Sequence, residues 1–220
     1  MDAYKNQRAA GVRAININEG DEVVGVRLTN GHNELLLANR NGRAVRFDED
    51  DIRSMGRVST GVIGMRLDGG DDEVVGMVCV NDPQTETIMV VSENGYGKRS
   101  EVEDYRKTAR GAKGVKTLAI TEKTGRLVAI KVVTDENDLM IINKSGILIR
   151  LKVADVRVMG RATQGVRLIN LSKKNDTIAS VCKVMSSQEE DVEEAEVISE
   201  DVQNVPSGDE TPMVDIVIDE

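Results

Sequence analysis

Apolar residues occur along this chain in short runs rich in valine, isoleucine and leucine, separated by turns rich in glycine, aspartate and asparagine. Short, β-branched runs bounded by turn residues are typical of β-strands rather than helices. Four such runs occupy comparable places along the chain and are expected to be equivalent strands: 22–28, 73–80, 127–133 and 177–184. The pattern therefore predicts an all-β protein.

Between these strands, paired apolar runs predict three β-hairpins, over 34–47, 87–99 and 139–151. Their turns contain the dipeptides Asn41-Gly42, Asn94-Gly95 and Ser145-Gly146. Asn-Gly favours a type I′ turn, because both central positions of that turn need a positive φ. Residues 44–47 alternate between apolar and basic, which places one face of the return strand inward and the other in solvent.

A basic, glycine-bearing segment occurs four times. The two most similar copies span 53–62 and 157–166, and looser copies span 4–12 and 105–115. Their anchoring glycines, Gly11, Gly61, Gly114 and Gly165, are 50, 53 and 51 residues apart. A fixed period of this length, with four strands in each repeat, indicates propeller-type blades. We therefore predict an array of four-stranded blades with a period of about 51 residues.

The formal net charge of -9 is the sum over two parts of the chain whose net charges have opposite signs. Residues 189–220 contain 13 acidic and no basic residues, which leaves 25 acidic and 29 basic residues in 1–188. Such asymmetry is typical of a nucleic-acid-binding body with an acidic appendage. The predicted domains are accordingly a repeat domain over 1–185 and a disordered acidic tail over 186–220.

The sequence lacks the residues that several kinds of functional site require. One histidine and two cysteines without a CxxC spacing cannot supply a zinc site. No glycine pair has the P-loop spacing, and no set of nucleophile, base and orienting group is recognisable. No apolar run approaches the ~20 residues of a membrane helix. We expect a cytoplasmic protein that binds no cofactor and no membrane.

The basic segments suggest phosphate binding, because glycines let the backbone approach a phosphate and arginines displace condensed counterions. They carry no aromatic platform for stacking single-stranded bases, so duplex DNA is the favoured partner. The alternative is that the glycines only form turns and the arginines only solvate the loops. The predicted DNA contacts are Arg8, Arg53, Arg57, Lys98, Arg99, Arg106, Arg110, Lys113, Arg157 and Arg161.

The stretches 92–99 (SENGYGKR), 160–167 (GRATQGVR) and 53–57 (RSMGR) resemble the C-terminal domain of bacterial DNA gyrase A. The resemblance runs from about residue 3 to 184. It implies a β-pinwheel, in which neighbouring blades exchange strands and duplex DNA wraps around a basic rim. The chain resembles only the last four blades, a partial array without the family's gyrase box, of which 108–114 (TARGAKG) is the nearest relic.

The resemblance also implies a larger enzyme, an ATP-dependent type II topoisomerase (an isomerase) that introduces negative supercoils. The cleavage tyrosine and the ATP site of that enzyme belong to regions other than this chain, which would act as a DNA-binding module. Its partners would be duplex DNA, the remainder of gyrase A, and gyrase B in an A2B2 complex. The expected location is the cytoplasm, in association with the nucleoid.

Three alternatives remain open. The first is the matching C-terminal domain of topoisomerase IV, which shares the fold and binds DNA crossings. The second is a protein-interaction propeller without a DNA role. The third is a hydrolytic propeller, which would need clustered histidines and carboxylates at its centre, and a single histidine argues against it.

Overall fold

The computed structural model describes residues 4–5, 9–171 and 176–186, and within these ranges it contains strands and short 3₁₀ helices but no α-helix. The all-β prediction is confirmed. Contacts divide the chain after Ser186, and all of these elements belong to the unit up to that residue. Arg8 and residues 187–220 of the predicted tail lie outside the described ranges.

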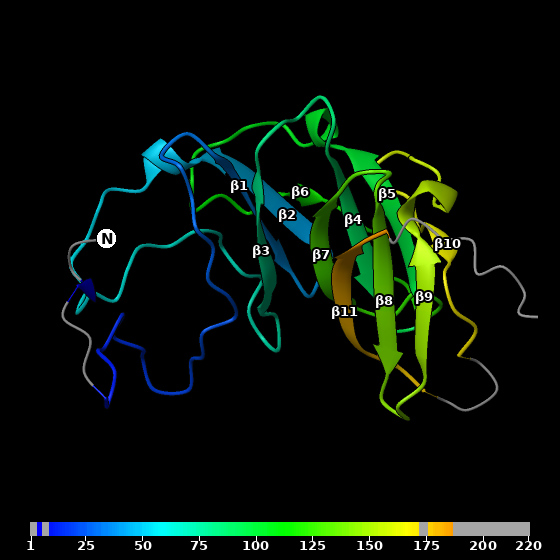
Figure 1. Cartoon of the computed structure of the whole chain (residues 1–220), viewed down its shortest axis with the longest axis horizontal. Coiled ribbons are helices and arrows are strands. Elements are labelled where there is room, and N and C mark those ends of the chain that lie inside the picture. Colours follow the sequence, from blue (N-terminus) through cyan, green and yellow to red (C-terminus); the bar gives the residue numbers. More distant parts are fainter. Residues whose placement is uncertain (1–3, 6–8, 172–175, 187–220) are drawn as a thin grey trace, which may run out of the picture. The chain divides into compact units, whose positions relative to one another are not determined.

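The strands form three antiparallel sheets that follow one another along the chain (Figure 1). The first sheet has the order β3 (Val74–Val80), β1 (Glu34–Asn39), β2 (Arg43–Asp48), β6 (Val115–Lys116). The second has the order β10 (Val166–Arg167), β5 (Tyr96–Glu101), β4 (Thr87–Ser92), β7 (Leu127–Val133). The third has the order β11 (Ile178–Met185), β8 (Asn137–Asn143), β9 (Leu148–Lys152).

The three predicted hairpins are confirmed as β1–β2, β4–β5 and β8–β9. Their turns differ from the predicted type I′ geometry. In the first turn the Gly42 amide donates to the Asn39 carbonyl, and Gly42 has a φ of 76°. The glycine is thus the fourth residue of the turn rather than a central one, as in a turn followed by a left-handed bulge residue. Gly95 and Gly146 repeat the arrangement.

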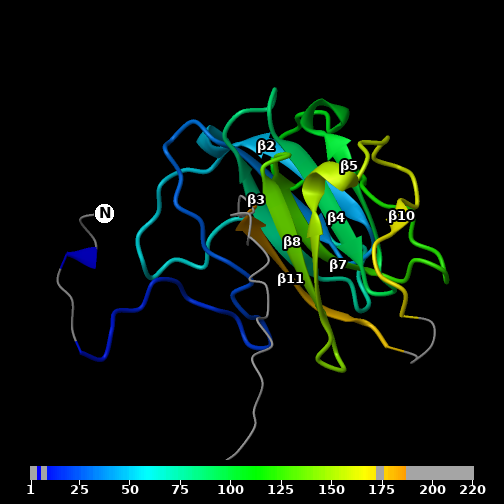
Figure 2. The same ribbon diagram turned by 45° about the vertical axis from the view of Figure 1, so that its right-hand side comes forward.

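Neighbouring units exchange strands. The short strand β6 follows the second hairpin along the chain but pairs with β2 of the first sheet. Likewise, β10 follows the third hairpin but pairs with β5 (Figure 2). Glycine makes this crossing possible: Gly114 has a φ of 79°, and a Cβ there would lie 2.5 Å from the Ala44 carbonyl oxygen. Gly165 meets the Gly97 carbonyl in the same way. The exchange confirms the pinwheel.

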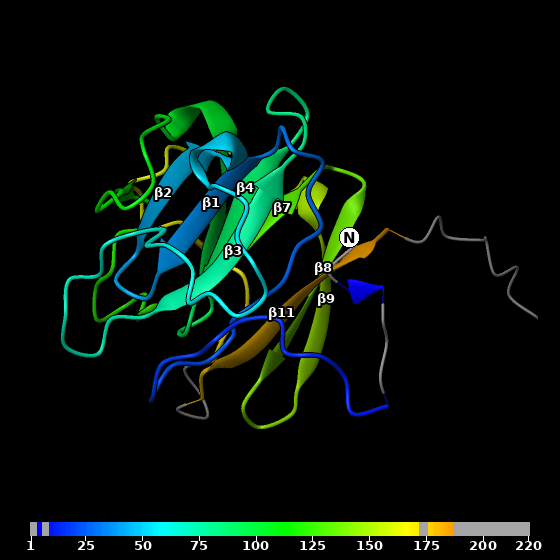
Figure 3. The same cartoon turned by 90° about the vertical axis from the view of Figure 1, so that its left-hand side faces the viewer.

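The hydrophobic core lies between adjacent sheets. Strand β4 is buried on both faces: Ile88 and Val90 pack toward the first sheet, while Met89 and Val91 pack toward the third. This alternation is the two-residue period of a strand. Strands β3, β7 and β11, one from each sheet, also contact one another in order, β7 lying against both β3 and β11 (Figure 3).

The predicted strand over 22–28 is absent, which corrects the expectation of four equivalent strands. Its side chains are exposed instead, with Val26 78% and Leu28 79% accessible. The equivalent strands β3, β7 and β11 each pair with the first strand of a preceding hairpin, and no described hairpin precedes residue 22. Among the described residues there are thus three sheets rather than four blades, and the third has three strands.

A buried arginine joins each of the first two hairpins to the following unit. Residues 44–47 are buried on both faces, which corrects the expectation that one face lies in solvent. Arg46 on β2 is 4% exposed, and its Nη1 donates to the carbonyls of Val102 and Tyr105 at 2.9 and 3.0 Å. These carbonyls belong to the 3₁₀ helix η3 (Val102–Asp104) and its cap. The Arg46 Nε donates to Glu34 at 2.6 Å, so the buried charge has a carboxylate partner.

Arg99 on β5 repeats the arrangement one unit later. Its Nη1 donates to the carbonyls of Val153 and Val156 at 3.0 and 3.4 Å, around the 3₁₀ helix η4 (Val153–Asp155). Its Nε donates to the Thr87 hydroxyl at 3.1 Å. We call Arg46 and Arg99 the clasp arginines. Another 3₁₀ helix, η2 (Glu49–Asp51), follows the first hairpin.

Replacement of a clasp arginine is expected to destabilise the domain. Arg46→Met leaves the Val102 and Tyr105 carbonyls without their donor and Glu34 with Lys107 as its remaining cationic partner, and should lower the free energy of unfolding by about 2–4 kcal/mol. Urea denaturation measures the change, with the exposed Arg53→Met as the matched control. Equal stability of the two variants would contradict the role of the clasp.

Replacement of a crossing glycine is expected to disturb the strand exchange. Gly165→Ala forces a side chain into a left-handed conformation against the Gly97 carbonyl, and should lower stability by about 1–3 kcal/mol. Gly160→Ala is the control, because nothing lies within 4 Å of its added Cβ. Hydrogen exchange of the Leu168 amide, which donates to Gly95, reports the loss of β10 pairing. Unchanged protection at Leu168 would refute this account.

Candidate nucleic-acid interface

Three of the basic segments form loops, and those over 105–115 and 157–166 lead from one sheet into the preceding one. We call residues 53–62, 105–115 and 157–166 the basic loops. Each contains two arginines at fixed distances from its anchoring glycine, an outer arginine eight residues before it and an inner arginine four residues before it. The outer arginines are Arg53, Arg106 and Arg157, and the inner arginines are Arg57, Arg110 and Arg161.

The inner arginines connect successive basic segments in series. In every case the guanidinium Nη1 donates to the carbonyl of the second residue after the preceding anchoring glycine. The pairs are Arg57 to Arg13 at 3.2 Å, Arg110 to Ile63 at 3.3 Å, and Arg161 to Lys116 at 2.8 Å. Each basic loop therefore lies beside the residues that follow the preceding anchoring glycine, although the two are far apart in sequence.

Two inner arginines also bind the preceding 3₁₀ helix. The Arg110 Nε donates to the Asp51 carbonyl at 3.1 Å, and the Arg161 Nε donates to the Asp104 carbonyl at 2.9 Å. A carbonyl at the end of such a helix has no internal donor, so a side chain that supplies one fixes the loop against it. The inner arginines thus position the loops.

The outer arginines are placed differently. Arg53, Arg106 and Arg157 are exposed, and no hydrogen bond or ion pair joins them to the described part of the chain. Their charges are available to an external anion. Lys113, also among the predicted contacts, is exposed but lies 2.5 Å from the Asp68 carboxylate, so its charge is partly compensated.

Two predicted contacts lie in the interior, and this corrects the sequence analysis. Lys98 is 0% and Arg99 is 5% exposed. The Lys98 Nζ donates to the Ser100 hydroxyl and to the Gly160 carbonyl, both at 2.9 Å, and Arg99 is a clasp arginine. Neither side chain reaches the surface. Both faces of β5 are buried. This burial depends on the neighbouring sheet and is not visible in the local sequence.

Burial also shifts the pKa values of Lys98, beneath the third basic loop, and of Tyr105, the first residue of the second. It lowers the pKa of Lys98 to about 8, although the nearby Asp104 acts in the opposite direction. It raises the pKa of Tyr105 to about 12, and the Tyr105 hydroxyl lies 2.6 Å from that of Thr117. Lys98 thus supports the basic loop from below at the Gly160 carbonyl.

Two further cations lie on the exchanged strands, and the sequence analysis did not include them among the predicted contacts. Lys116 on β6 is paired in register with Arg43, and Arg167 on β10 is paired with Tyr96. Both cations are the second residue after an anchoring glycine, so the same repeat period contained the signal. Lys123 reaches the Tyr96 ring from a neighbouring turn.

Other kinds of site find no support in the described ranges. There, no group of three or more histidine, cysteine, aspartate or glutamate residues is arranged to hold a metal ion. Within the same ranges, no helix is long and apolar enough to cross a membrane.

The repeats match a known family model, described as DNA gyrase C-terminal domain, beta-propeller, over residues 1–30, 33–81, 86–134 and 137–182. This chain belongs to the DNA gyrase C-terminal domain family. The last three matched repeats each contain one hairpin and the strand β3, β7 or β11 that pairs with it. The first matched repeat covers the segment in which the predicted strand is absent.

Curated members of the family are similar over most of this chain. It is 46% identical over 189 residues to DNA gyrase A of Staphylococcus aureus strain MRSA252, which covers 86% of this chain. It is 45% identical over 192 residues to the same protein of strain NCTC 8325 / PS 47. The chain spans about a fifth of the length of these relatives, as the match covers 21% of each.

Solved structures support the same fold. The C-terminal domain of DNA topoisomerase IV matches with a TM-score of 0.77 and 29% identity, over 83% of this chain and 56% of that one. A DNA gyrase A C-terminal domain matches with a TM-score of 0.72 and 28% identity, over 80% of this chain and 59% of that one. The fold is thus common to both kinds of topoisomerase domain.

The low pKa of Lys98 predicts a pH dependence of stability. Because the folded pKa of about 8 lies below the unfolded value near ~10.4, the unfolded chain binds more protons between these values. The free energy of unfolding should therefore rise by about 1–2 kcal/mol from pH 8 to 10, and the contribution of Lys98 should be constant only below about pH 7.

The rise should be absent from Lys98→Met. Above pH 10 the raised pKa of Tyr105 acts in the opposite direction, because the unfolded tyrosine loses its proton first. Urea denaturation of both proteins at pH 7, 8, 9 and ~10 measures the difference. A difference between wild type and variant that does not change with pH would show that Lys98 titrates normally.

Proposed function

We propose that this chain is a module that binds duplex DNA through its basic loops. The observation that carries the proposal is the recurrence of an exposed outer arginine at one register in three consecutive loops. The inner arginines fix each loop beside the residues that follow the preceding anchoring glycine, so Arg53, Arg106 and Arg157 are presented as a series. The family to which the chain belongs supports a role at DNA.

The chemistry of the loops favours contact with the DNA backbone over reading of bases. Arginine donates to phosphate oxygens in a fixed fork, and such contacts position a protein without specifying sequence. Tyr105, at the start of the second loop, is 0% exposed and offers no ring for stacking. Binding is therefore expected to be independent of sequence and strongly dependent on salt.

A series of contacts along successive units also favours wrapping. A duplex that follows the series must pass from one blade to the next and bend with them, and the bending energy is offset by the additional phosphate contacts. In a complete gyrase, with the rest of gyrase A and with gyrase B, such wrapping would support ATP-dependent negative supercoiling. The sequence identity to DNA gyrase A supports this assignment.

A second candidate is the corresponding domain of topoisomerase IV, acting at DNA crossings. The TM-score of 0.77 to a topoisomerase IV domain supports this candidate at the level of the fold. The 46% identity to a gyrase A protein exceeds the 29% identity to that domain, and so the gyrase assignment is preferred.

The salt dependence of DNA binding tests the proposal. Binding of the 220-residue chain to a short duplex is measured by fluorescence anisotropy at several salt concentrations. Each of Arg53→Gln, Arg106→Gln and Arg157→Gln should reduce the slope of log K against log salt by about 0.9, and the triple variant by about 2.7. Circular dichroism verifies that the variants are folded.

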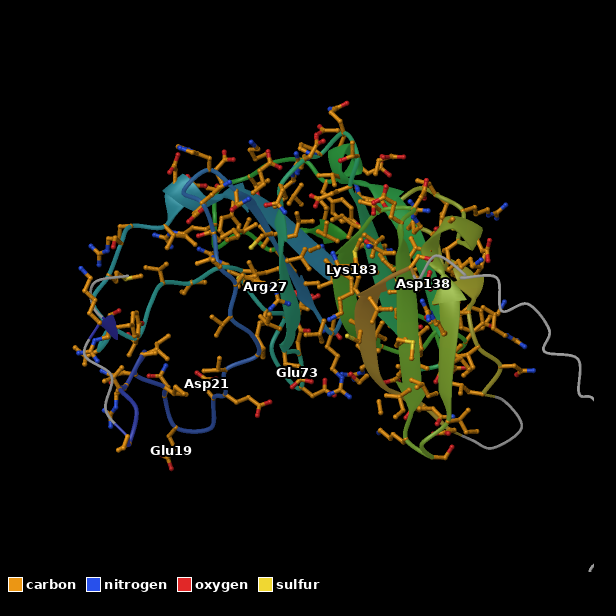
Figure 4. All side chains as sticks on the ribbon, viewed as in Figure 1. Glu19, Asp21, Arg27, Glu73, Asp138 and Lys183 are labelled. Atoms are coloured by element: carbon orange, nitrogen blue, oxygen red, sulfur yellow. The ribbon has the colours of Figure 1, made fainter. Side chains whose placement is uncertain are left out.

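Lys183→Gln is the matched control, because it removes one exposed charge from β11, away from the basic loops (Figure 4). Its slope should equal that of the wild type. If Lys183→Gln lowers the slope as much as the loop variants do, the basic loops are not the binding surface. A wild type with weak, salt-insensitive binding would refute the DNA role of this chain altogether.

A further inference from the structure

The exchange of β10 into the second sheet creates a pocket outside the basic loops. We call it the seam notch. It has a volume of about 280 Å³ and lies between β5, β10 and the turn that precedes β7. Tyr96, Lys123 and Arg167 line it, together with Asn94 and Asp176.

Arg167 is held at the notch by Tyr96. The two residues are directly paired between β10 and β5. The Arg167 Nε and Nη2 donate to the Tyr96 hydroxyl at 3.3 and 3.0 Å, and the guanidinium carbon lies 5.6 Å from the ring centre. Arginine has five N–H donors, so several remain for a ligand after these two bonds.

Lys123 approaches the same ring from another turn. Its Nζ lies 5.3 Å from the centre of the Tyr96 ring. The turn is fixed to the second hairpin by Asn94, whose Nδ2 donates to the carbonyls of Glu122 and Lys123 at 3.0 and 3.3 Å. Two cations from separate segments therefore converge on one tyrosine.

One carboxylate lines the notch, but its oxygens are already engaged. Asp176 accepts hydrogen bonds from the Ser145 hydroxyl at 2.5 Å and from the Thr177 amide at 2.8 Å. The bond from Ser145 is the main cause of the lowered pKa of Asp176, which is therefore charged at neutral pH. In the described part of the chain, no ion pair joins a carboxylate to Lys123 or Arg167. The lining retains a net positive charge.

We propose that the seam notch binds a phosphate group, specifically a phosphodiester of duplex DNA that passes from the third basic loop. Two converging cations match an anion, while the Tyr96 ring is too buried, at 7% exposure, to stack on a base. The chain runs directly from the loop over 157–166 into Arg167, so the notch extends the path of the outer arginines. This inference rests on the proposed function.

The strand exchange between the first two units differs, because a carboxylate of the chain already lies beside its cations. There the paired cations are Arg43 and Lys116, and Asp68 lies 3.6 Å from the Arg43 Nε and 2.5 Å from the Lys113 Nζ. Its carboxylate occupies the position of an external anion. The second exchange is therefore expected to bind phosphate more strongly than the first.

The test compares Arg167→Gln, Lys123→Gln and the rescue variant Arg167→Lys in the 220-residue chain. We expect Arg167→Gln and Lys123→Gln each to reduce the salt slope of duplex binding by about 0.9, and Arg167→Lys to retain it. Lys183→Gln is again the control. Thermal unfolding of every variant separates loss of a contact from loss of the fold.

Four outcomes are informative. Reduced slopes with an unchanged melting temperature support the notch as a DNA contact. Wild-type slopes in Lys123→Gln and Arg167→Gln, while Arg157→Gln lowers the slope, overturn the notch and leave the DNA role intact. An NMR titration with inorganic phosphate that shifts the Arg167 side chain, without any effect of the variants on DNA, assigns the notch to small anions and also overturns the proposal. Loss of slope in Arg167→Lys as well indicates a structural role and likewise overturns it.

Discussion

The buried clasp arginines are the interaction on which the arrangement of the units depends. Each unit is a small antiparallel sheet that cannot bury both faces alone, so it must be held against its neighbours. Arg46 and Arg99 do this with the strongest donors available, directed at carbonyls around the 3₁₀ helices η3 and η4. A buried charge without such partners is strongly destabilising, so the clasp also excludes other placements of the next unit.

The basic loops inherit their positions from this packing. Once η3 and η4 are fixed, the chain must cross the preceding hairpin to reach β6 and β10, and only glycine fits at Gly114 and Gly165. At these two positions the glycine is therefore required by the crossing of the chain, which is a structural role rather than contact with a phosphate. The arginines divide the work: the inner series fixes the loops, and the outer series remains exposed for a ligand.

Much of the fold was predictable, because strand runs, turn glycines and the repeat period are local signals. The three hairpins were found in this way, whereas the exchange of strands was implied only by the resemblance to the gyrase A C-terminal domain. The candidate site was predicted less completely. Lys98 and Arg99 look like surface cations in the sequence, yet both are buried, while Lys116 and Arg167 were missed at a register that the period contained. Proximity across a seam, as between Lys123 and Tyr96, has no local signal at all.

The sequence by itself determined the three hairpins, the spacing of the arginines and the family, because all three depend on residues close together or on a fixed period. Only the tertiary structure decided which cations are exposed. Burial is set by the adjacent sheet, and the same position in a hairpin is covered in Arg46 yet half exposed in Arg150. It also decided that 22–28 is no strand, since a strand needs a partner edge and local β-propensity alone cannot supply one.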